Sequence, residues 1–529
     1  MSAIITDNIR ILNAKNFVAS LGSTTNSYYS FIGLPNAEDY DPNWDNFPTP
    51  PKDSFDELNE VWETIIALKK ISNDDIRQVI RKIQWTSGDT YDMYRHDISR
   101  NNVSSVTERT SLYSSNFYVV NEDYRVYICL QNGTTPEYIN GRPSLSEPTF
   151  TDLEPRSAGS SGDGYVWKYL YTIKPSDVRK FDSVEFVPTP RNWETNISNE
   201  SVRKNASKSG QLKIITIVNR GTGLGPARSY IVPINGDGKG AEATIIVGND
   251  AKVESVTIRN GGSGYTYGTL DLVSVNFPVG IDPPPEFNVI IPPPGGHGFD
   301  IYKELGATNV LIYSRIENDT ESPDFITGNQ IARIGIIENP LNYDSTSVLS
   351  IDKVSAVSAL KLKGILNVSE YETAKFVPDS EITQNIGFGV SVVGRVVSYD
   401  NKTGILKYWQ DRGMYGFNYG GEFNSDRSRK DTKPIAKYGY QVKNFTSTPE
   451  SSGDLIIRGG SVNLGIDTSF SGISTTINNT TYILGQEFIS GISNPEIKKY
   501  SGNIIFVDNR PSITRSINQK EDIKVILQF

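Results

Sequence analysis

Residues 162–173 have the sequence Gly-Asp-Gly-Tyr-Val-Trp-Lys-Tyr-Leu-Tyr-Thr-Ile. The glycines permit a tight turn, because glycine adopts backbone conformations that other residues avoid. Aromatic residues then occupy every second position, which is the period of a β-strand. The positions between them are also apolar or amphipathic, so both faces of the strand are expected to be covered. This stretch therefore predicts a strand that is central in a sheet or covered by other parts of the chain.

The aromatic face of this strand has two interpretations. It consists of Tyr165, Trp167, Tyr169 and Tyr171. Aromatic side chains contribute large apolar areas to a core, and they also anchor many protein–protein contacts. The pattern favours core packing. The alternative is that part of this face contacts a partner protein.

Strand patterns recur from about residue 104 to the end of the chain, separated by turns rich in glycine and proline. The run at 126–130 is apolar, and its Cys129 is expected to be a small buried residue. At the C-terminus, Ile523, Val525, Leu527 and Phe529 alternate with other residues, as in a half-buried strand. The chain is predicted to be mainly β and multidomain, with β-sandwich layers and a few helices near the N-terminus.

Two helices are predicted between residues 54 and 81. Ser54 and Glu57 have the spacing of a capping box. Apolar residues then recur at helical spacing as far as Leu68, so the first helix is predicted over 54–70. The second is predicted over 73–81. Both helices are expected to cover a sheet.

An internal repeat marks the middle of the chain. Residues 213–218 and 253–258 are β-rich runs, and each leads into a glycine-rich turn. Two copies are too few for a solenoid, so the repeat predicts an inserted β-domain over 206–290. A second stretch, 351–489, combines strand patterns with loops rich in Gly, Ser, Thr and Asn, and predicts a second inserted all-β domain. The rest of the chain is then divided into 1–205, 291–350 and 490–529.

Charge and composition exclude several classes of partner. The formal net charge is −9, from 61 acidic and 52 basic residues, whereas a nucleic-acid-binding protein needs a basic surface. The basic cluster at 427–430 is short and is expected to be a solvated loop.

The N-terminus lacks the pattern of a signal peptide. No membrane span is predicted, because the chain has no apolar run of about 18 residues. The single cysteine cannot form a disulfide within the chain.

Motifs for catalysis or cofactor binding are incomplete. The glycine run at 221–225 resembles a dinucleotide loop, but a strand pattern follows it where a helix would have to receive the pyrophosphate. Residues 236–240 are expected to form a hairpin turn and not a calcium or phosphate loop. His96 and His297 are the only histidines, too few for a histidine-rich metal site, and His297 is expected in a flexible linker. We expect no cofactor, no metal and no small-molecule substrate.

The chain resembles a known family at several places. Residues 162–173 closely resemble a motif of the baseplate wedge protein encoded by gene 8 of T-even-like contractile-tailed phages, and so does the C-terminal part of the chain. The resembling segments, which occur in the family's order, are Trp85 with 88–91, 126–130, 162–173, 334–341, 501–513 and 519–529. The chain is similar to a longer variant of this family. The resemblance implies nothing about the insertions at 206–290 and 351–489.

The resemblance implies a non-enzymatic structural subunit of the virion, located in the tail baseplate and assembled in the host cytoplasm. It implies a homodimer that links neighbouring wedge proteins and takes part in baseplate assembly and in the rearrangement when the tail contracts. The alternative is a tail-associated protein that binds or hydrolyses glycans, because carboxylates are abundant and a glycosidase needs two of them across a cleft.

Asn509 and Arg510 belong to the resembling C-terminal segment. Together with the aromatic face, they are candidate interface or family-motif residues. Arg510 can form a bidentate pair with a carboxylate. We expect this pair to stabilise a loop of its own fold, and the alternative is a contact with a neighbouring protein.

Overall fold

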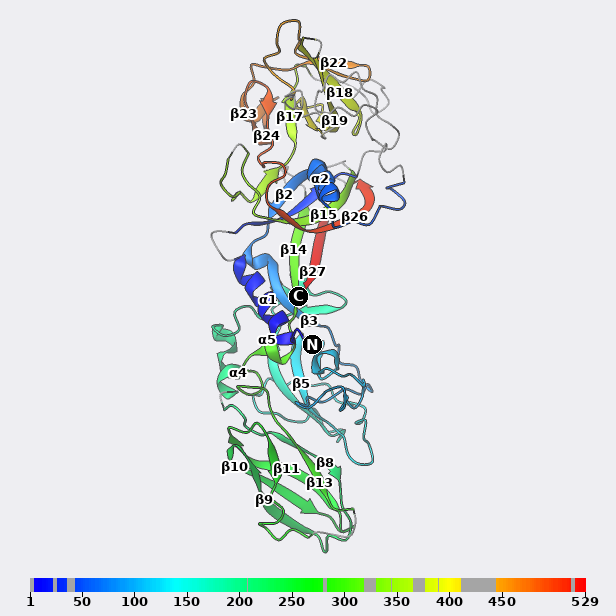
Figure 1. The fold of residues 1–529 in the computed structure, drawn as a ribbon, viewed down its shortest axis with the longest axis vertical. Coiled ribbons are helices and arrows are strands. Elements are labelled where there is room, and N and C mark those ends of the chain that lie inside the picture. Colours follow the sequence, from blue (N-terminus) through cyan, green and yellow to red (C-terminus); the bar gives the residue numbers. More distant parts are fainter. Residues whose placement is uncertain are drawn as a thin grey trace. The chain divides into compact units, whose positions relative to one another are not determined.

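The structure is a computed structural model, and it describes residues 4–21, 26–35, 43–206, 208–278, 283–317, 330–343, 345–364, 376–388, 390–410, 444–514 and 519–529. The basic cluster at 427–430 lies outside these residues. The chain divides into two compact units, whose elements are labelled in Figure 1. The first comprises Met1–Ala19, Asp74–Ile312 and Lys524–Phe529, and the second Ser20–Asn73 and Tyr313–Ile523. Several sheets and few helices confirm the prediction of a mainly β, multidomain chain.

The first unit contains the strand predicted at 162–173. Strand β6 (Tyr165–Thr172) pairs with β5 (Arg125–Asn132), which pairs with β4 (Tyr118–Val120). Strand β6 is therefore at the edge of this sheet and not at its centre. A bridge between Trp167 and Arg156 covers its outer edge, and Cys129 on β5 is fully buried. A covered strand and a buried cysteine are confirmed.

The predicted helix at 73–81 is wrong. The structure has one 3₁₀ turn, Asn73–Asp75, followed by strand β3 (Ile76–Arg81). Residues 76–80 are all buried, because β3 lies between β14 and β7 within a sheet and both of its faces are covered. A short apolar run with both faces buried cannot be assigned to a helix or a strand from periodicity alone.

The first unit contains a second sheet and several helices. The sheet that contains β3 has the order β27-β14-β3-β7, and the division between the two units falls within β14 and β27. The bounds are β7 (Phe186–Pro188), β14 (Asn309–Glu317), β27 (Lys520–Gln528), α1 (Asp7–Ser20), α3 (Pro175–Phe181), α4 (Glu200–Asn205) and α5 (Ile301–Glu304), with 3₁₀ turns at Leu112–Ser114 and Ile197–Asn199. Along β27, Ile523 and Val525 are buried and their neighbours are exposed, which confirms the predicted alternation.

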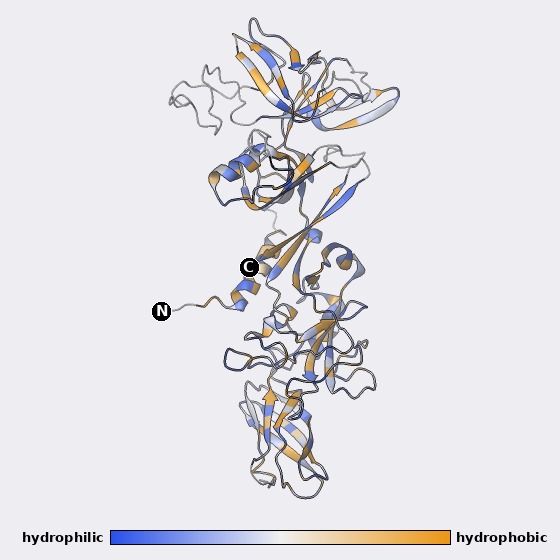
Figure 2. Ribbon diagram, turned by 90° about the vertical axis from the view of Figure 1, so that its right-hand side faces the viewer, coloured by the Kyte–Doolittle hydropathy of each residue, from blue (hydrophilic) through white to orange (hydrophobic). Residues whose placement is uncertain are grey.

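The segment predicted as the first insertion forms only strands. They are β8 (Ile214–Asn219), β9 (Arg228–Gly236), β10 (Lys239–Val247), β11 (Val253–Ser263), β12 (Gly268–Leu270) and β13 (Glu286–Ile290). Sheets of order β11-β10-β9-β12 and β13-β8 result, with hydrophobic and hydrophilic residues alternating along the strands (Figure 2). The glycine run at 221–225 precedes a strand, and the turn at 236–239 joins a hairpin, both as predicted. Two apolar clusters, around Tyr265 and Phe277, are built from residues between Leu212 and Ile291.

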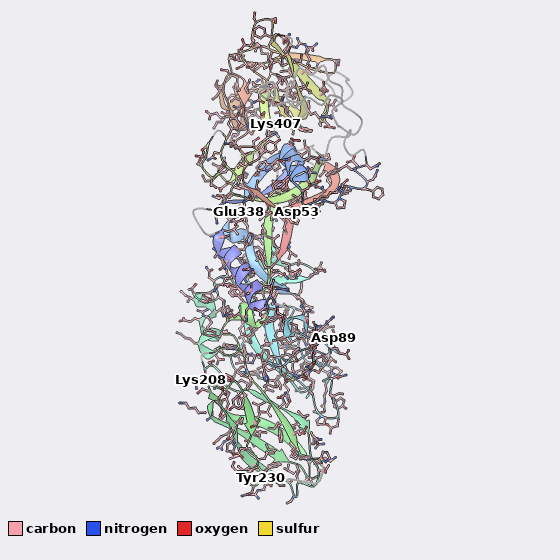
Figure 3. All side chains as sticks on the ribbon, in the orientation of Figure 1. Asp53, Asp89, Lys208, Tyr230, Glu338 and Lys407 are labelled. Carbon is pink, nitrogen blue, oxygen red and sulfur yellow. The ribbon has the colours of Figure 1, made fainter. Side chains whose placement is uncertain are left out.

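The second unit contains a five-stranded sheet of order β16-β2-β1-β15-β26. Its strands are β1 (Tyr28–Gly33), β2 (Ile65–Lys70), β15 (Gln330–Glu338), β16 (Lys353–Ser355) and β26 (Asn503–Thr514). Side chains connect neighbouring strands: the Tyr28 hydroxyl donates to Glu338 Oε1 at 2.6 Å, and Glu338 is labelled in Figure 3. Burial, together with this carboxylate, raises the pKa of Tyr28 to about 12.

The helix predicted over 54–70 is confirmed at its start and wrong at its end. Helix α2 (Phe55–Thr64) begins at the predicted cap, where the Ser54 side chain accepts a hydrogen bond from Glu57 N at 3.2 Å. The chain then changes directly into β2. Residues 65–68 are consecutive and at most 1% exposed, which a strand inside a covered sheet achieves and a helix with one buried face does not.

A seven-stranded sheet and a separate hairpin complete the second unit. The sheet order is β22-β21-β18-β19-β20-β17-β25. The bounds are β17 (Ser358–Lys361), β18 (Glu381–Gly387), β19 (Val390–Asp400), β20 (Ile405–Trp409), β21 (Ile456–Gly459), β22 (Val462–Gly465) and β25 (Ile492–Ser493). The separate hairpin consists of β23 (Gly472–Ile477) and β24 (Thr480–Phe488). The extent of the two insertions as independent domains stays a prediction.

Candidate functional site

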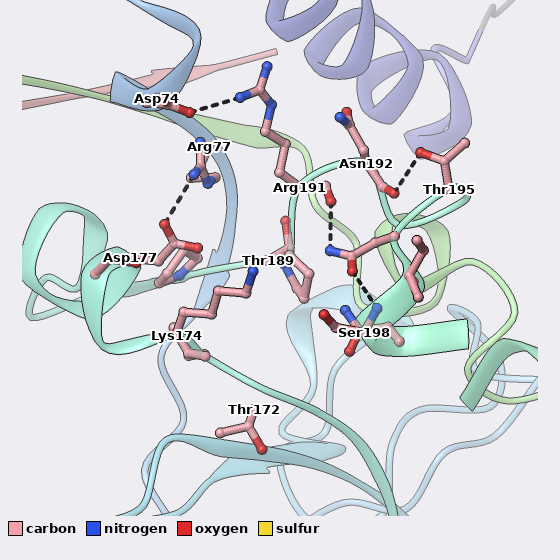
Figure 4. Close-up of a pocket in the computed structure, with 17 residues that line it drawn as sticks. Asp74, Arg77, Thr172, Lys174, Asp177, Thr189, Arg191, Asn192, Thr195 and Ser198 are labelled. Atoms are coloured by element: carbon pink, nitrogen blue, oxygen red, sulfur yellow. Dashed lines mark hydrogen bonds and ion pairs between the residues drawn. The ribbon is translucent and has the colours of Figure 1, made fainter. Parts of the chain in front are cut away.

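A polar groove of about 550 Å³ lies in the first unit (Figure 4). Its walls come from the start of β3, the chain between β6 and α3, and the loop that follows β7. The loop is shaped by its own polar side chains: Asn196 Nδ2 donates to Arg191 O, and Asn196 Oδ1 accepts from Ser198 N at 2.9 Å. The groove is therefore built from segments that are each fixed by local hydrogen bonds.

The charged groups of the groove pair mainly with one another. Arg77 Nη2 donates to Asp177 Oδ1 at 3.1 Å, and both side chains are largely buried. The Arg77 guanidinium also lies over the Phe181 ring, 4.9 Å from its centroid. At the rim, Arg191 pairs with Asp74 at 3.0 Å. The 17 residues that line the groove include no histidine and no cysteine. This arrangement stabilises the walls of the groove.

The aromatic residues of β6 are placed mostly in the core. Tyr165, Trp167 and Tyr171 are fully buried, whereas Tyr169 is half-buried. Tyr165 and Trp167 stack with a centroid distance of 5.2 Å. The Tyr165 hydroxyl donates to Arg142 O at 2.8 Å and accepts from Tyr91 N at 2.9 Å. Only Tyr169 on this face keeps an accessible part of its side chain.

Asn509 and Arg510 lie beside a buried arginine, Arg333, that the sequence did not indicate. Arg333 on β15 is 0% exposed, and its Nε donates to Asn509 Oδ1 at 2.8 Å. Its Nη1 donates to Thr64 Oγ1 at 2.6 Å, and the Glu57 carboxylate lies 3.9 Å from its Nη2. Burial lowers the pKa of Arg333 to about 10, and Glu57 opposes this shift.

Arg510 itself is half-exposed. Its Nε donates to Asp508 Oδ2 at 2.5 Å, two residues away on the same strand, and its carbonyl oxygen accepts from Trp44 Nε1 at 2.9 Å. Asn509 Nδ2 in turn donates to Thr49 O at 2.9 Å. These contacts attach the segment around Trp44 to β26. Within the described residues, the Arg510 side chain is thus found in a pair within its own fold.

The expected flexible linker at His297 is wrong. His297 is 6% exposed, and its Nδ1 lies 2.6 Å from Glu304 Oε1 on α5. The other Glu304 oxygen accepts from Gly298 N at 2.7 Å, and the Tyr94 ring packs edge-on against the imidazole. Burial lowers the pKa of His96, which accepts a hydrogen bond from Ile291 N through its Nδ1. Both histidines have structural contacts. The prediction was wrong because the glycine-rich composition was interpreted as flexibility. Gly295, Gly296 and Gly298 instead adopt positive φ angles and form a packed turn.

In the described part of the chain, no three residues among His, Cys, Asp and Glu lie together in a way that could hold a metal ion. None of the helices found there is long and apolar enough to cross a membrane.

The described sites share one property: buried charges and aromatic residues connect segments of the chain to one another. The chain is thus of the class of multidomain, mainly β proteins. Residues 3–156 match the model of the family described as Bacteriophage T4, Gp8. None of the curated proteins compared with the chain matches it. This confirms the resemblance to the gene 8 baseplate wedge family over residues 3–156 and supports a structural role in the baseplate.

The matched region contains two of the resembling segments, Trp85 with 88–91 and 126–130. It ends before the motif at 162–173. The likeness of that motif, and of the segments at 334–341, 501–513 and 519–529, therefore stays a prediction.

Proposed function

We propose that the chain is a wedge subunit of the baseplate of a contractile phage tail, which links neighbouring wedge proteins and takes part in baseplate assembly and in the rearrangement on contraction. The observation that carries this proposal is the match of residues 3–156 to the Gp8 family. The subunit is assembled into the tail in the host cytoplasm, forms a homodimer and has no enzymatic activity. Its partners are proteins, with no nucleic acid, membrane, cofactor or small-molecule substrate among them.

The internal contacts support a role that requires fixed surfaces. Arg77 and Arg333 are both buried, and each forms a hydrogen bond to a segment that is distant in sequence. Breaking a buried ion pair such as Arg77–Asp177 on one side costs about 3–5 kcal/mol, so these connections keep the exposed loops in place. Of the candidate interface residues, Tyr169 and Arg510 have side chains accessible to a partner. The polar groove at the loop after β7 is a second accessible surface.

The experiment that tests this function removes the chain during infection. A stop codon placed early in its gene is expected to give particles without complete baseplates, and supplying the wild-type chain in trans is expected to restore them. Electron microscopy of the lysate distinguishes the outcomes. Complete, normal baseplates without the chain would overturn the proposal.

A biochemical measurement on the purified chain tests the remaining parts. Light scattering at micromolar concentration is expected to give the mass of a dimer, and a monomer would contradict the homodimer.

Incubation with host surface polysaccharide is expected to release no reducing sugar. Release that depends on the chain would instead favour the glycan-hydrolysing alternative.

A further inference from the structure

The two copies of the internal repeat contact each other reciprocally. They are offset by 41 residues, so that Leu212 corresponds to Val253 and Arg220 corresponds to Gly261. Leu212 N donates to Gly261 O at 2.9 Å, and Val253 N donates to Arg220 O at 2.9 Å. Exchanging the two copies converts one of these hydrogen bonds into the other.

A second pair of hydrogen bonds shows the same reciprocity. Leu224 N donates to Ala251 O at 2.9 Å. The corresponding residues at the same offset are Tyr265 and Gly210, and Tyr265 N donates to Gly210 O at 3.3 Å. In a solenoid each repeat contacts only its neighbours in sequence order, whereas reciprocal contacts of this kind define a two-fold interface.

The glycine turns of the two copies have the same backbone conformation. Asn219 Oδ1 accepts from Gly221 N at 2.8 Å, and Asn260 Oδ1 accepts from Gly262 N at 3.1 Å. The φ angles of Gly221 and Gly262 are 65° and 59°, a region that favours glycine. The likeness between the copies is therefore in the backbone as well as in the sequence.

The strands of each copy pair with strands of the other. Strands β8, β9 and β10 belong to the first copy, and β11, β12 and β13 belong to the second. Strand β10 pairs with β11 with Thr244 opposite Thr257. Strand β13 pairs with β8 with Asn288 opposite Thr216, the residue that corresponds to Thr257. Asn288 thus corresponds to Thr244, and neither copy completes its sheets alone.

We propose that the described part of 207–291 is an internal dimer, in which two copies of one β-unit, 207–247 and 248–291, are related by a local two-fold axis. Strand β9 pairs with β12, its counterpart in the other copy, as strands beside such an axis must. A duplication within the chain supplies the second copy, so this domain needs no further subunit to close. The inference does not depend on the baseplate role.

The two copies differ in sequence in a complementary way. Tyr265 lies against Gly236, where an added Cβ would be 3.1 Å from the tyrosine ring. The residues that correspond to them are Leu224 and Phe277, which share one apolar cluster. A large residue faces a small one in one place, and the sizes are reversed in the other, so that both contacts are filled.

The copies also differ where the first copy is attached to the rest of the first unit. Lys213 Nζ donates to Glu154 Oε2 at 2.9 Å, and Ile214 belongs to the main apolar cluster. The corresponding residues are Glu254 and Ser255. Glu254 would repel Glu154, and serine would leave the apolar contact empty. An exchange of the copies therefore requires Glu254→Lys and Ser255→Ile.

The first test exchanges the two copies within the full chain. Residues 248–291 follow Ala206 directly, residues 207–247 come next, and Pro292 continues the chain, with Glu254→Lys and Ser255→Ile included. All contacts between the copies are kept, because the exchange changes only the order in which the chain connects them. Hydrogen exchange measured by mass spectrometry reports on the amides between 212 and 265.

The matched control exchanges 207–236 with 237–291 and carries the same two substitutions. Its composition is identical, but its junctions lie at positions that the two-fold axis does not relate, and it interrupts the hairpin of β9 and β10. The amides are expected to exchange at least about tenfold more slowly in the symmetric variant than in this control.

A second measurement leaves the order of the chain unchanged. Asn219→Ala and Asn260→Ala each remove one of the two corresponding side-chain hydrogen bonds. Each variant is expected to accelerate amide exchange in its own turn by a similar factor of about fivefold.

The outcomes decide the inference directly. Slower exchange in the symmetric variant than in the control, together with similar effects of the two asparagine variants, supports the internal dimer. Equal exchange in the symmetric variant and the control overturns it, and so do asparagine variants whose factors differ more than about tenfold.

Discussion

Asn509 and Arg510 are adjacent in sequence, but their side chains have different surroundings. Asn509 is the hydrogen-bond partner of the buried Arg333 Nε, whereas Arg510 contacts the nearby Asp508 at the surface. Asn509→Ala is expected to lower the free energy of unfolding by about 2 kcal/mol, because a buried charged donor loses its acceptor. Arg510→Ala is expected to change it by less than about 0.5 kcal/mol. Urea denaturation of both variants measures this difference, and equal effects would contradict it.

Lys168 gives a prediction about pH. Its side chain is 2% exposed, and its ammonium donates to Leu153 O at 2.7 Å and Asn205 Oδ1 at 2.8 Å. Burial lowers the pKa of Lys168 to about 8, with Lys213 acting in the same direction and Glu304 and Glu154 opposing. Between pH 8 and the unfolded pKa of about 10.4, Lys168 binds a proton more readily in the unfolded chain than in the folded chain. The contribution of Lys168 to the free energy of unfolding therefore rises with pH.

The measurement compares the wild-type chain with Lys168→Met. The free energy of unfolding of the wild type relative to this variant is expected to increase by about 2 kcal/mol from pH 8 to pH 10. Taking the difference removes contributions from the tyrosines that titrate in the same range. A difference that stays constant with pH would contradict the lowered pKa of Lys168 in the folded chain.

For single residues, burial could in some cases be predicted from the sequence, but the partners of the buried polar residues could not. Cys129 and the aromatic residues of β6 could be assigned to a core from local alternation alone. Arg333 could not be connected to Asn509, because 176 residues separate them and nothing local in either segment indicates the other. The same applies to His297 and Glu304, where the glycines suggested flexibility and the turn is instead packed.

At the scale of elements, the chain was predictable where a local signal is unambiguous. The capping box at Ser54, the hairpin turn at 236–239 and the alternation in β27 are such signals. Strands β2 and β3 were predicted as helices because their apolar residues satisfy both periods. Their neighbours in the sheets, supplied by residues far away in sequence, decide the outcome. Tertiary contacts therefore account for both errors.

At the scale of the whole molecule, residues 216–288 provide a test of the predicted insertion. Strands β8 and β13 pair antiparallel with Ile215 opposite Val289, so the two ends of this segment are adjacent. The apolar cluster around Phe277 is formed within the same part of the chain, whereas the cluster around Tyr265 also includes Leu212, Ile215, Val289 and Ile291 at its two ends. Replacing residues 216–288 by Asn-Gly should therefore close a two-residue hairpin between Ile215 and Val289 and leave the main apolar cluster of the first unit intact.

The shortened chain is expected to unfold cooperatively, with a melting temperature within about 4 °C of the full chain. Calorimetry measures this, and a control that removes residues 215–289 and joins Ile214 directly to Ile290 should melt lower, because no turn then connects the paired strands. Ile214 and Ile290 belong to the main cluster of the first unit, so the boundary of the insertion lies inside them. Loss of the cooperative transition in the Asn-Gly variant would show that the segment is part of the common core and not an insertion added to it.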